Sequence, residues 1–145
     1  MALVDFIPLE GQRQIAQAIT EAEKKTSGEI CVHVTPRCCF SPIRKAKRKF
    51  DKLGLYKTLR RNAVLIYIAY KSKKFAIIGD YCINEAVPKD FWENEKKILA
   101  KSLAQGRPVE GLCEIIARIG DALSTYFPAD REDLNELSNE VTYED

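Results

Sequence analysis

The stretch Arg61–Asp80, RNAVLIYIAYKSKKFAIIGD, decides the fold of this chain. Val64–Ala69 and Phe75–Ile78 are apolar runs rich in β-branched and aromatic residues, which predicts two buried strands. The short polar segment between them predicts a tight turn. In such a hairpin, the start of the first strand and the end of the second lie at the same end of the sheet. We therefore expect Asn62 and Asp80 to be neighbours.

A strand and a helix precede the hairpin. Alternating apolar residues predict a strand over Glu29–Thr35, and helical spacing after Ser41 predicts a helix that ends near Leu53. A strand, a helix and a strand in this order predict a right-handed crossover, with the outer two elements parallel. Glu29 then begins its strand at the same end of the sheet as Asp80.

Helices account for most of the remaining chain. Helical periodicity predicts a first helix over about Leu9–Lys25, a third over about Pro88–Gln105 and a fourth over about Pro108–Phe127. These elements predict an α/β fold in which a small mixed sheet lies between helical layers, with about four main helices. Three strands are few for 145 residues, which leaves room for a short edge strand. We expect one domain over residues 1–128 and an acidic tail over residues 129–145, which carries seven acids and one Arg.

Composition is typical of a soluble globular protein, with 46% apolar and 30% charged residues. No run approaches the roughly 18 apolar residues that cross a membrane, and the N-terminus lacks the basic and apolar regions of a signal peptide. We therefore expect a cytoplasmic protein. The five cysteines include no CxxC pair, which favours reduced thiols. A redox role at the adjacent Cys38 and Cys39 is the alternative.

Basic residues are concentrated in residues 44–61, where nine Lys and Arg side chains accompany one acid, Asp51. Such a segment attracts nucleic acid or anionic lipid. No nucleic-acid module signature is present and no aromatic series interleaves the basic residues, so we expect no nucleic-acid partner. Two interpretations stay open: a solvated helix face, or a surface that binds anionic partners.

Oxygen-bearing side chains gather at the end of the sheet where Asp80 lies. Glu29, Asn62 and Asp80 come from three strand ends, and Asn84 and Asp90 come from the segment that follows. Carboxylate and amide oxygens are the ligands that Ca²⁺ and Mg²⁺ prefer. The pattern predicts a divalent-cation site built from Asp80 with Glu29, Asn62 and one of Asn84 or Asp90. The alternative is that Asp80 and Asn84 are turn residues and that Asp90 favours a helix N-terminus.

Other catalytic signatures are absent from the sequence. His33 is the only histidine, and its place within a predicted strand favours a structural role over that of a catalytic base. No GxSxG, P-loop, GxGxxG, HExxH or EF-hand motif occurs. We assign no catalytic residue and no nucleotide cofactor from the sequence.

The order of segments resembles the TPM domain family, named for a thylakoid-lumen protein, a photosystem II assembly protein and a nematode receptor modulator. The resemblance lies in Ala22–Ile30 (AEKKTSGEI), Arg61–Ala69 (RNAVLIYIA), Ile77–Asp80 (IIGD) with Ile83-Asn84, Phe91-Trp92, and Gly111–Gly120. It implies a Rossmann-like αβα sandwich and divalent-cation binding at the edge of the sheet, with an acid-phosphatase assignment for some plant members. The chain looks most like the short bacterial members that lack a signal peptide and a membrane anchor.

Two residues depart from the family's pattern. Ala63 replaces the glycine that follows Asn62 in the family, and Cys82 stands where many members have a second glycine. Both add side-chain atoms where a ligand would approach the backbone. These departures weigh against phosphatase activity more than against metal binding.

Three hypotheses of function follow. The first is a non-enzymatic Ca²⁺- or Mg²⁺-binding accessory or adaptor domain, monomeric, which assists a membrane-associated protein complex. The second is a metal-assisted phosphomonoesterase, in which a bound cation activates water and Arg61 clamps phosphate oxygens. The third is an anionic-surface binder that uses residues 44–61.

Overall fold

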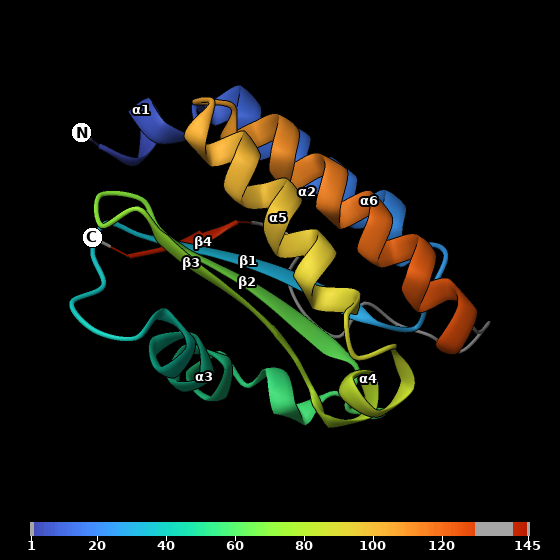
Figure 1. The fold of residues 1–145 in the computed structure, drawn as a ribbon. Coiled ribbons are helices and arrows are strands. Elements are labelled where there is room, and N and C mark those ends of the chain that lie inside the picture. The colour runs from blue at the N-terminus through green and yellow to red at the C-terminus, as the bar shows by residue number, and fades with distance from the viewer. Residues whose placement is uncertain (1, 130–140, 145) are drawn as a thin grey trace.

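A mixed four-stranded sheet is the centre of the computed structural model, which describes residues 2–129 and 141–144 (Figure 1). Its strand order is β3-β2-β1-β4, with β1 (Glu29–Thr35), β2 (Ala63–Ala69), β3 (Lys74–Gly79) and β4 (Thr142–Tyr143). The helices of the described residues are α1 (Leu3–Phe6), α2 (Leu9–Glu23), α3 (Pro42–Lys52), α4 (Tyr81–Ala86), α5 (Phe91–Ala104) and α6 (Pro108–Tyr126), with a 3-10 turn η1 (Leu55–Lys57). The predicted α/β class is confirmed, and α2, α3, α5 and α6 are its main helices.

Strand pairing follows the predicted crossover and hairpin. β1 and β2 are parallel, with Glu29 opposite Ala63, and α3 connects them. β3 then returns antiparallel to β2, with Val64 opposite Gly79. β1 and β2 therefore begin at the end of the sheet where β3 finishes. We call this the Asp80 end, because Asp80 directly follows β3.

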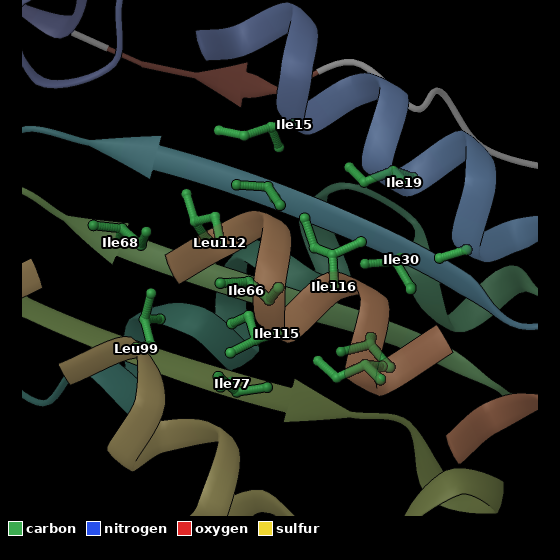
Figure 2. Close-up of a cluster of buried hydrophobic side chains, with 14 of the residues drawn as sticks. Ile15, Ile19, Ile30, Ile66, Ile68, Ile77, Leu99, Leu112, Ile115 and Ile116 are labelled. Carbon is green, nitrogen blue, oxygen red and sulfur yellow. The ribbon is translucent and has the colours of Figure 1, made fainter. Parts of the chain in front are cut away.

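Helices cover both faces of the sheet, as Figure 1 shows: α2, α5 and α6 lie on one side, and α3 lies on the other. Every residue of β1 and β2 is buried, which is typical of strands with both faces covered. Alternate residues divide between the two cores. Figure 2 shows Ile66 and Ile77 of the sheet beside Leu99 and Ile115 of the helical layer, whereas Leu65 packs in the second core with α3.

Three features add to the predicted elements or differ from them. The segment after Asp80 is a short helix, α4, because the Asp80 carboxylate accepts a hydrogen bond from the Tyr81 amide and caps it. α5 begins at Phe91, three residues after the proline at which we expected it. The chain end that we assigned to an acidic tail contains β4, in which Thr142 pairs with His33. Most of that tail, residues 130–140, lies outside the described residues.

No helix among the described residues is both long enough and apolar enough to cross a bilayer.

Candidate functional site

Three of the predicted site residues meet at the Asp80 end of the sheet. The Glu29 amide donates a hydrogen bond to the Asn62 carbonyl at 3.3 Å, and the Asp80 amide donates to the Ala63 carbonyl at 2.9 Å. Glu29, Asn62 and Asp80 are all buried, with at most 6% of each residue exposed. Carboxylates in such positions need a compensating partner, so their contacts decide what the site can do.

Asp80 holds a cationic group at close range. The Arg61 guanidinium donates two hydrogen bonds to its carboxylate, from Nε at 2.7 Å and from Nη2 at 2.8 Å. This hydrogen bonding, with the charge attraction of Asp80, raises the pKa of Arg61 above its usual range. Half of the Arg61 side chain is exposed, whereas Asp80 is almost wholly buried. Arg61 therefore reaches in from solvent to neutralise a carboxylate that the fold has fixed.

Arg61 also has an unusual backbone. Its φ is 50°, in the left-handed region that few side chains other than glycine adopt readily. The residue lies just before β2, where the Arg61 carbonyl accepts a hydrogen bond from the Cys82 amide at 3.2 Å. The turn that starts β2 is thus tied to the start of α4, and this contact holds Arg61 beside Asp80.

A cleft of about 210 Å³ opens next to this ion pair. Four charged side chains line it: Lys47 and Asp51 of α3, Arg61, and Asp80. Tyr56 of η1 completes the wall on the side of α3. The cleft therefore presents two carboxylates and two cationic groups, and Asp51 faces it although our sequence reasoning did not select that residue. The available signal was that Asp51 is the single acid of a basic helix.

Glu29 lies two strands away from Asp80 on the same face of the sheet. Glu29 is opposite Ala63, and the Ala63 carbonyl bonds the Asp80 amide, so Ala63 lies between the two acids. Two strand spacings separate them, roughly 10 Å between backbones. Burial, together with the nearby charges of Glu23 and Glu29, raises the pKa of Cys31 to about 11, which agrees with Glu29 and Cys31 sharing one face of β1.

Asn62 and Asn84 make structural hydrogen bonds. The Asn62 amide group donates to Ser27 Oγ at 3.2 Å, joining β2 to the start of β1. Asn84 donates to the Gly79 carbonyl at 2.8 Å and accepts from Trp92 Nε1 at 3.0 Å. A Cβ on Gly79 would lie 2.6 Å from the Trp92 ring, so Trp92 and Asn84 lie on the α5 side of β3. Because strand residues alternate, the Asp80 side chain points the other way, toward α3.

Asp90 lies apart from the cleft. It is exposed and directly precedes α5, and its side chain makes no capping hydrogen bond there. The structure therefore places Glu29, Asn62 and Asp80 at one end of the sheet, with Ala63 between the two acids, whereas Asn84 lies on the α5 side and Asp90 directly precedes α5. Of the predicted set, Asp80 alone lines the cleft.

The donor set of the cleft suits a hard cation that keeps part of its water shell. No group of three or more His, Cys, Asp or Glu side chains suited to a metal occurs among residues 2–129 and 141–144. Asp51 and Asp80 nevertheless offer two carboxylates, which is the number that Mg²⁺ uses when water supplies its other ligands. A cation here would have few protein ligands, and it would compete with Arg61 for the Asp80 carboxylate.

His33 is remote from this cleft and has a structural setting. It is 2% exposed, its Nδ1 lies 2.7 Å from Thr142 Oγ1, and its ring stacks on Tyr67. Burial and the nearby Lys49 ammonium lower the pKa of His33 to about 4, so the ring is neutral near pH 7. The predicted structural role of His33 fits these contacts.

Comparison with known proteins gives three findings. The sequence profile of the TPM domain matches residues 3–122. The NMR structure of BA42 protein from the psychrophilic bacterium Bizionia argentinensis is 36% identical, with 99% of each chain covered and a TM-score of 0.91. The N-terminal domain of the cg2496 protein from Corynebacterium glutamicum is 12% identical over 84% of this chain and 77% of that one, with a TM-score of 0.64, a similarity of fold. No curated protein matches the chain.

Proposed function

This chain belongs to the TPM domain family, and we propose that it binds a hard divalent cation, Mg²⁺ or Ca²⁺, in the cleft beside Asp80. The observation that carries the proposal is the buried Asp80 carboxylate, which faces a cleft shared with Asp51 and already holds a guanidinium. A carboxylate that binds one cationic group at 2.7 Å offers the same oxygens to another cation.

Asp80 and Asp51 would supply the protein ligands, and water would supply the others. Glu29, on the same face of the sheet, is the third carboxylate of this end and adds negative potential. Arg61 competes with the cation for Asp80, and its half-exposed side chain can turn outward without unfolding the strand end. Binding is therefore an exchange between an internal counter-ion and an external one.

We propose a non-enzymatic accessory role for the bound form. The cleft contains carboxylates and cationic groups, whereas His33 is buried at the β1–β4 pairing. The resemblance to short bacterial members supports a cytoplasmic monomer that assists a membrane-associated protein complex. In that role the cation would release Arg61 from Asp80 and bind Asp51 of α3, and so alter the surface that a partner meets.

Isothermal titration calorimetry with Mg²⁺ and Ca²⁺ tests the cation site. We expect Asp80→Asn to abolish the binding heat and Arg61→Met to tighten binding, by about twofold to fivefold for a half-exposed ion pair. Asp121→Asn is the matched control, because this exposed acid of α6 pairs with Lys25 at the helical surface, away from the cleft. No heat with the wild-type chain, or equal binding by Asp80→Asn, would refute the proposal.

A second candidate is a metal-assisted phosphomonoesterase. The observation that favours it is the presence of Lys47 and Arg61 in the same cleft as the two carboxylates, because cationic groups bind phosphate oxygens. A bound cation would supply a water of lowered pKa as nucleophile. Hydrolysis of p-nitrophenyl phosphate, followed from about pH 4 to about pH 9 with and without Mg²⁺, decides the question. No cation-dependent turnover, or turnover unchanged in Asp80→Asn, excludes this candidate.

A further inference from the structure

The outer side of α3 carries a stripe of positive charge. Arg44, Arg48 and Lys52 follow one another at intervals of four residues, and all three are exposed. Residues four apart lie on the same face of a helix. The opposite face of α3 buries Ala46 and Phe50 against the sheet. The stripe therefore points away from the body of the protein.

Exposed apolar side chains flank this stripe at both ends. Phe40 lies just before α3, with 74% of the residue exposed. Tyr56 and Leu59 follow its end, with 43% and 85% exposed. Leu59 is the most exposed large apolar residue among those described, and it lies in a segment rich in Lys and Arg.

The body of the protein uses other basic residues of this segment for its own ion pairs. Lys49 pairs with Glu144 at 2.8 Å, and only 14% of its side chain is exposed. Arg61 pairs with Asp80. These two residues hold the chain end and the cleft. Of the stripe, Lys52 is exposed but lies near enough to Glu144 to assist Lys49 in lowering the pKa of that carboxyl, whereas Arg44 and Arg48 are exposed on the outer side of the helix.

We propose that this surface docks on an anionic lipid bilayer. We call it the basic face and define it as Arg44, Arg48, Lys52 and Lys57 with the flanking Phe40 and Leu59. The eleven residues of α3 span about 16 Å, and a helix that lies flat on the bilayer along its charged stripe would bring the exposed apolar side chains beyond its two ends, Phe40 and Leu59, to the headgroup region. Anionic headgroups complement the charges between them.

A bilayer accounts for the basic face better than a nucleic acid does. A nucleic acid would engage the charged stripe, but it offers no apolar medium for the side chains of Leu59 and Phe40. Interfacial membrane helices combine basic residues with apolar ones that enter the headgroup and acyl boundary. The proposal is independent of cation binding, because none of Arg44, Arg48 and Lys52 lines the cleft.

Vesicle co-sedimentation with the full chain tests the proposal, in EDTA so that cation binding plays no part. The probes are phosphatidylcholine vesicles with and without phosphatidylserine. The test variant is the triple change Arg44→Gln, Arg48→Gln and Lys52→Gln. The control variant removes three exposed charges from the α5 side of the protein, Lys89→Gln, Lys97→Gln and Lys101→Gln. Both variants therefore have the same net charge.

We expect the chain to bind phosphatidylserine vesicles and the test variant to bind about a hundredfold more weakly, since each basic residue near the surface contributes roughly fivefold. The control variant should bind within about twofold of the wild type, and Leu59→Ser should weaken binding without changing its salt dependence. No binding of the wild-type chain, equal binding to neutral vesicles, or equal losses in the two triple variants would overturn the proposal. Retention on heparin or RNA without vesicle binding would overturn it in favour of a nucleic-acid surface.

Discussion

Replacing Gly79 with alanine should destabilise the fold at the strand end that positions Asp80. A Cβ at residue 79 would lie 2.6 Å from Trp92 Cζ2 and 3.0 Å from Asn84 Oδ1. Non-bonded carbons are normally about 3.5–4.0 Å apart, so the indole ring must move by about 1 Å. That movement stretches the hydrogen bond from Trp92 Nε1 to Asn84 Oδ1, which is 3.0 Å long.

The expected cost combines two effects. Overpacking by one methyl group costs about 1–3 kcal/mol, and a weakened hydrogen bond costs about 1 kcal/mol. Trp92 is only half-buried and can yield in part, so the expected loss is about 2 kcal/mol. For a chain of this size that loss lowers the melting temperature by about 4–8 °C.

A double-mutant cycle isolates the contact. Urea unfolding is followed by far-UV circular dichroism, because Trp92 is the only tryptophan and its fluorescence is lost in one arm of the cycle. In a Trp92→Leu background, Gly79→Ala should cost less than about 0.5 kcal/mol, since the clashing ring has gone. An equal cost in both backgrounds would refute the argument that Trp92 requires glycine at residue 79.

Two further predictions concern buried titratable groups. Burial holds the pKa of His33 at about 4, below its usual 6.5, so folding favours the neutral ring. The contribution of His33 to the free energy of unfolding is therefore complete above about pH 6.5 and declines toward pH 4 by at most about 1.4 kcal/mol per pH unit. His33→Gln should reduce the loss of stability between about pH 7 and about pH 5, measured by urea unfolding at each pH. An equal loss of stability in the wild type and the variant would contradict the prediction. Among the thiols, the exposed Cys39 should be alkylated first, and the buried Cys31, whose pKa is raised to about 11, should be alkylated last. Peptide mass spectrometry after brief iodoacetamide treatment measures the order. Alkylation of Cys39 and Cys31 at the same rate would contradict the prediction.

The hairpin and the crossover could be predicted because β1 and β2 are buried along their whole length and the edge strand β3 is still largely apolar. Val64–Ala69 is apolar without interruption, a pattern that few other elements of this length share. The register followed from the short turn, which leaves Val64 opposite Gly79. The order strand, helix, strand predicted that β1 and β2 are parallel, and they are. Such a connection is right-handed in nearly all proteins.

Two short elements were beyond prediction for a different reason. β4 has two residues, too few for any periodicity, and its pairing with β1 depends on contacts far away in sequence, such as Thr142 with His33. α4 has six residues and no apolar stripe, so its only local signal is the capping carboxylate of Asp80. A carboxylate before a polar segment is as typical of a turn as of a helix start.

The candidate site shows how far backbone reasoning extends. Strand pairing alone brings Asp80 next to Ala63 and places Glu29 across the same strand. Side-chain direction needs one more rule, the alternation of residues along a strand. Gly79 faces α5, where its missing side chain makes room for Trp92, and Asp80 therefore faces α3. The helix over that face, and not the loop after the strand, then supplies the second carboxylate, Asp51. The site to which an acid at a strand end belongs is therefore decided by two things. One is the face of the sheet to which its side chain points, and the other is the helix that covers that face.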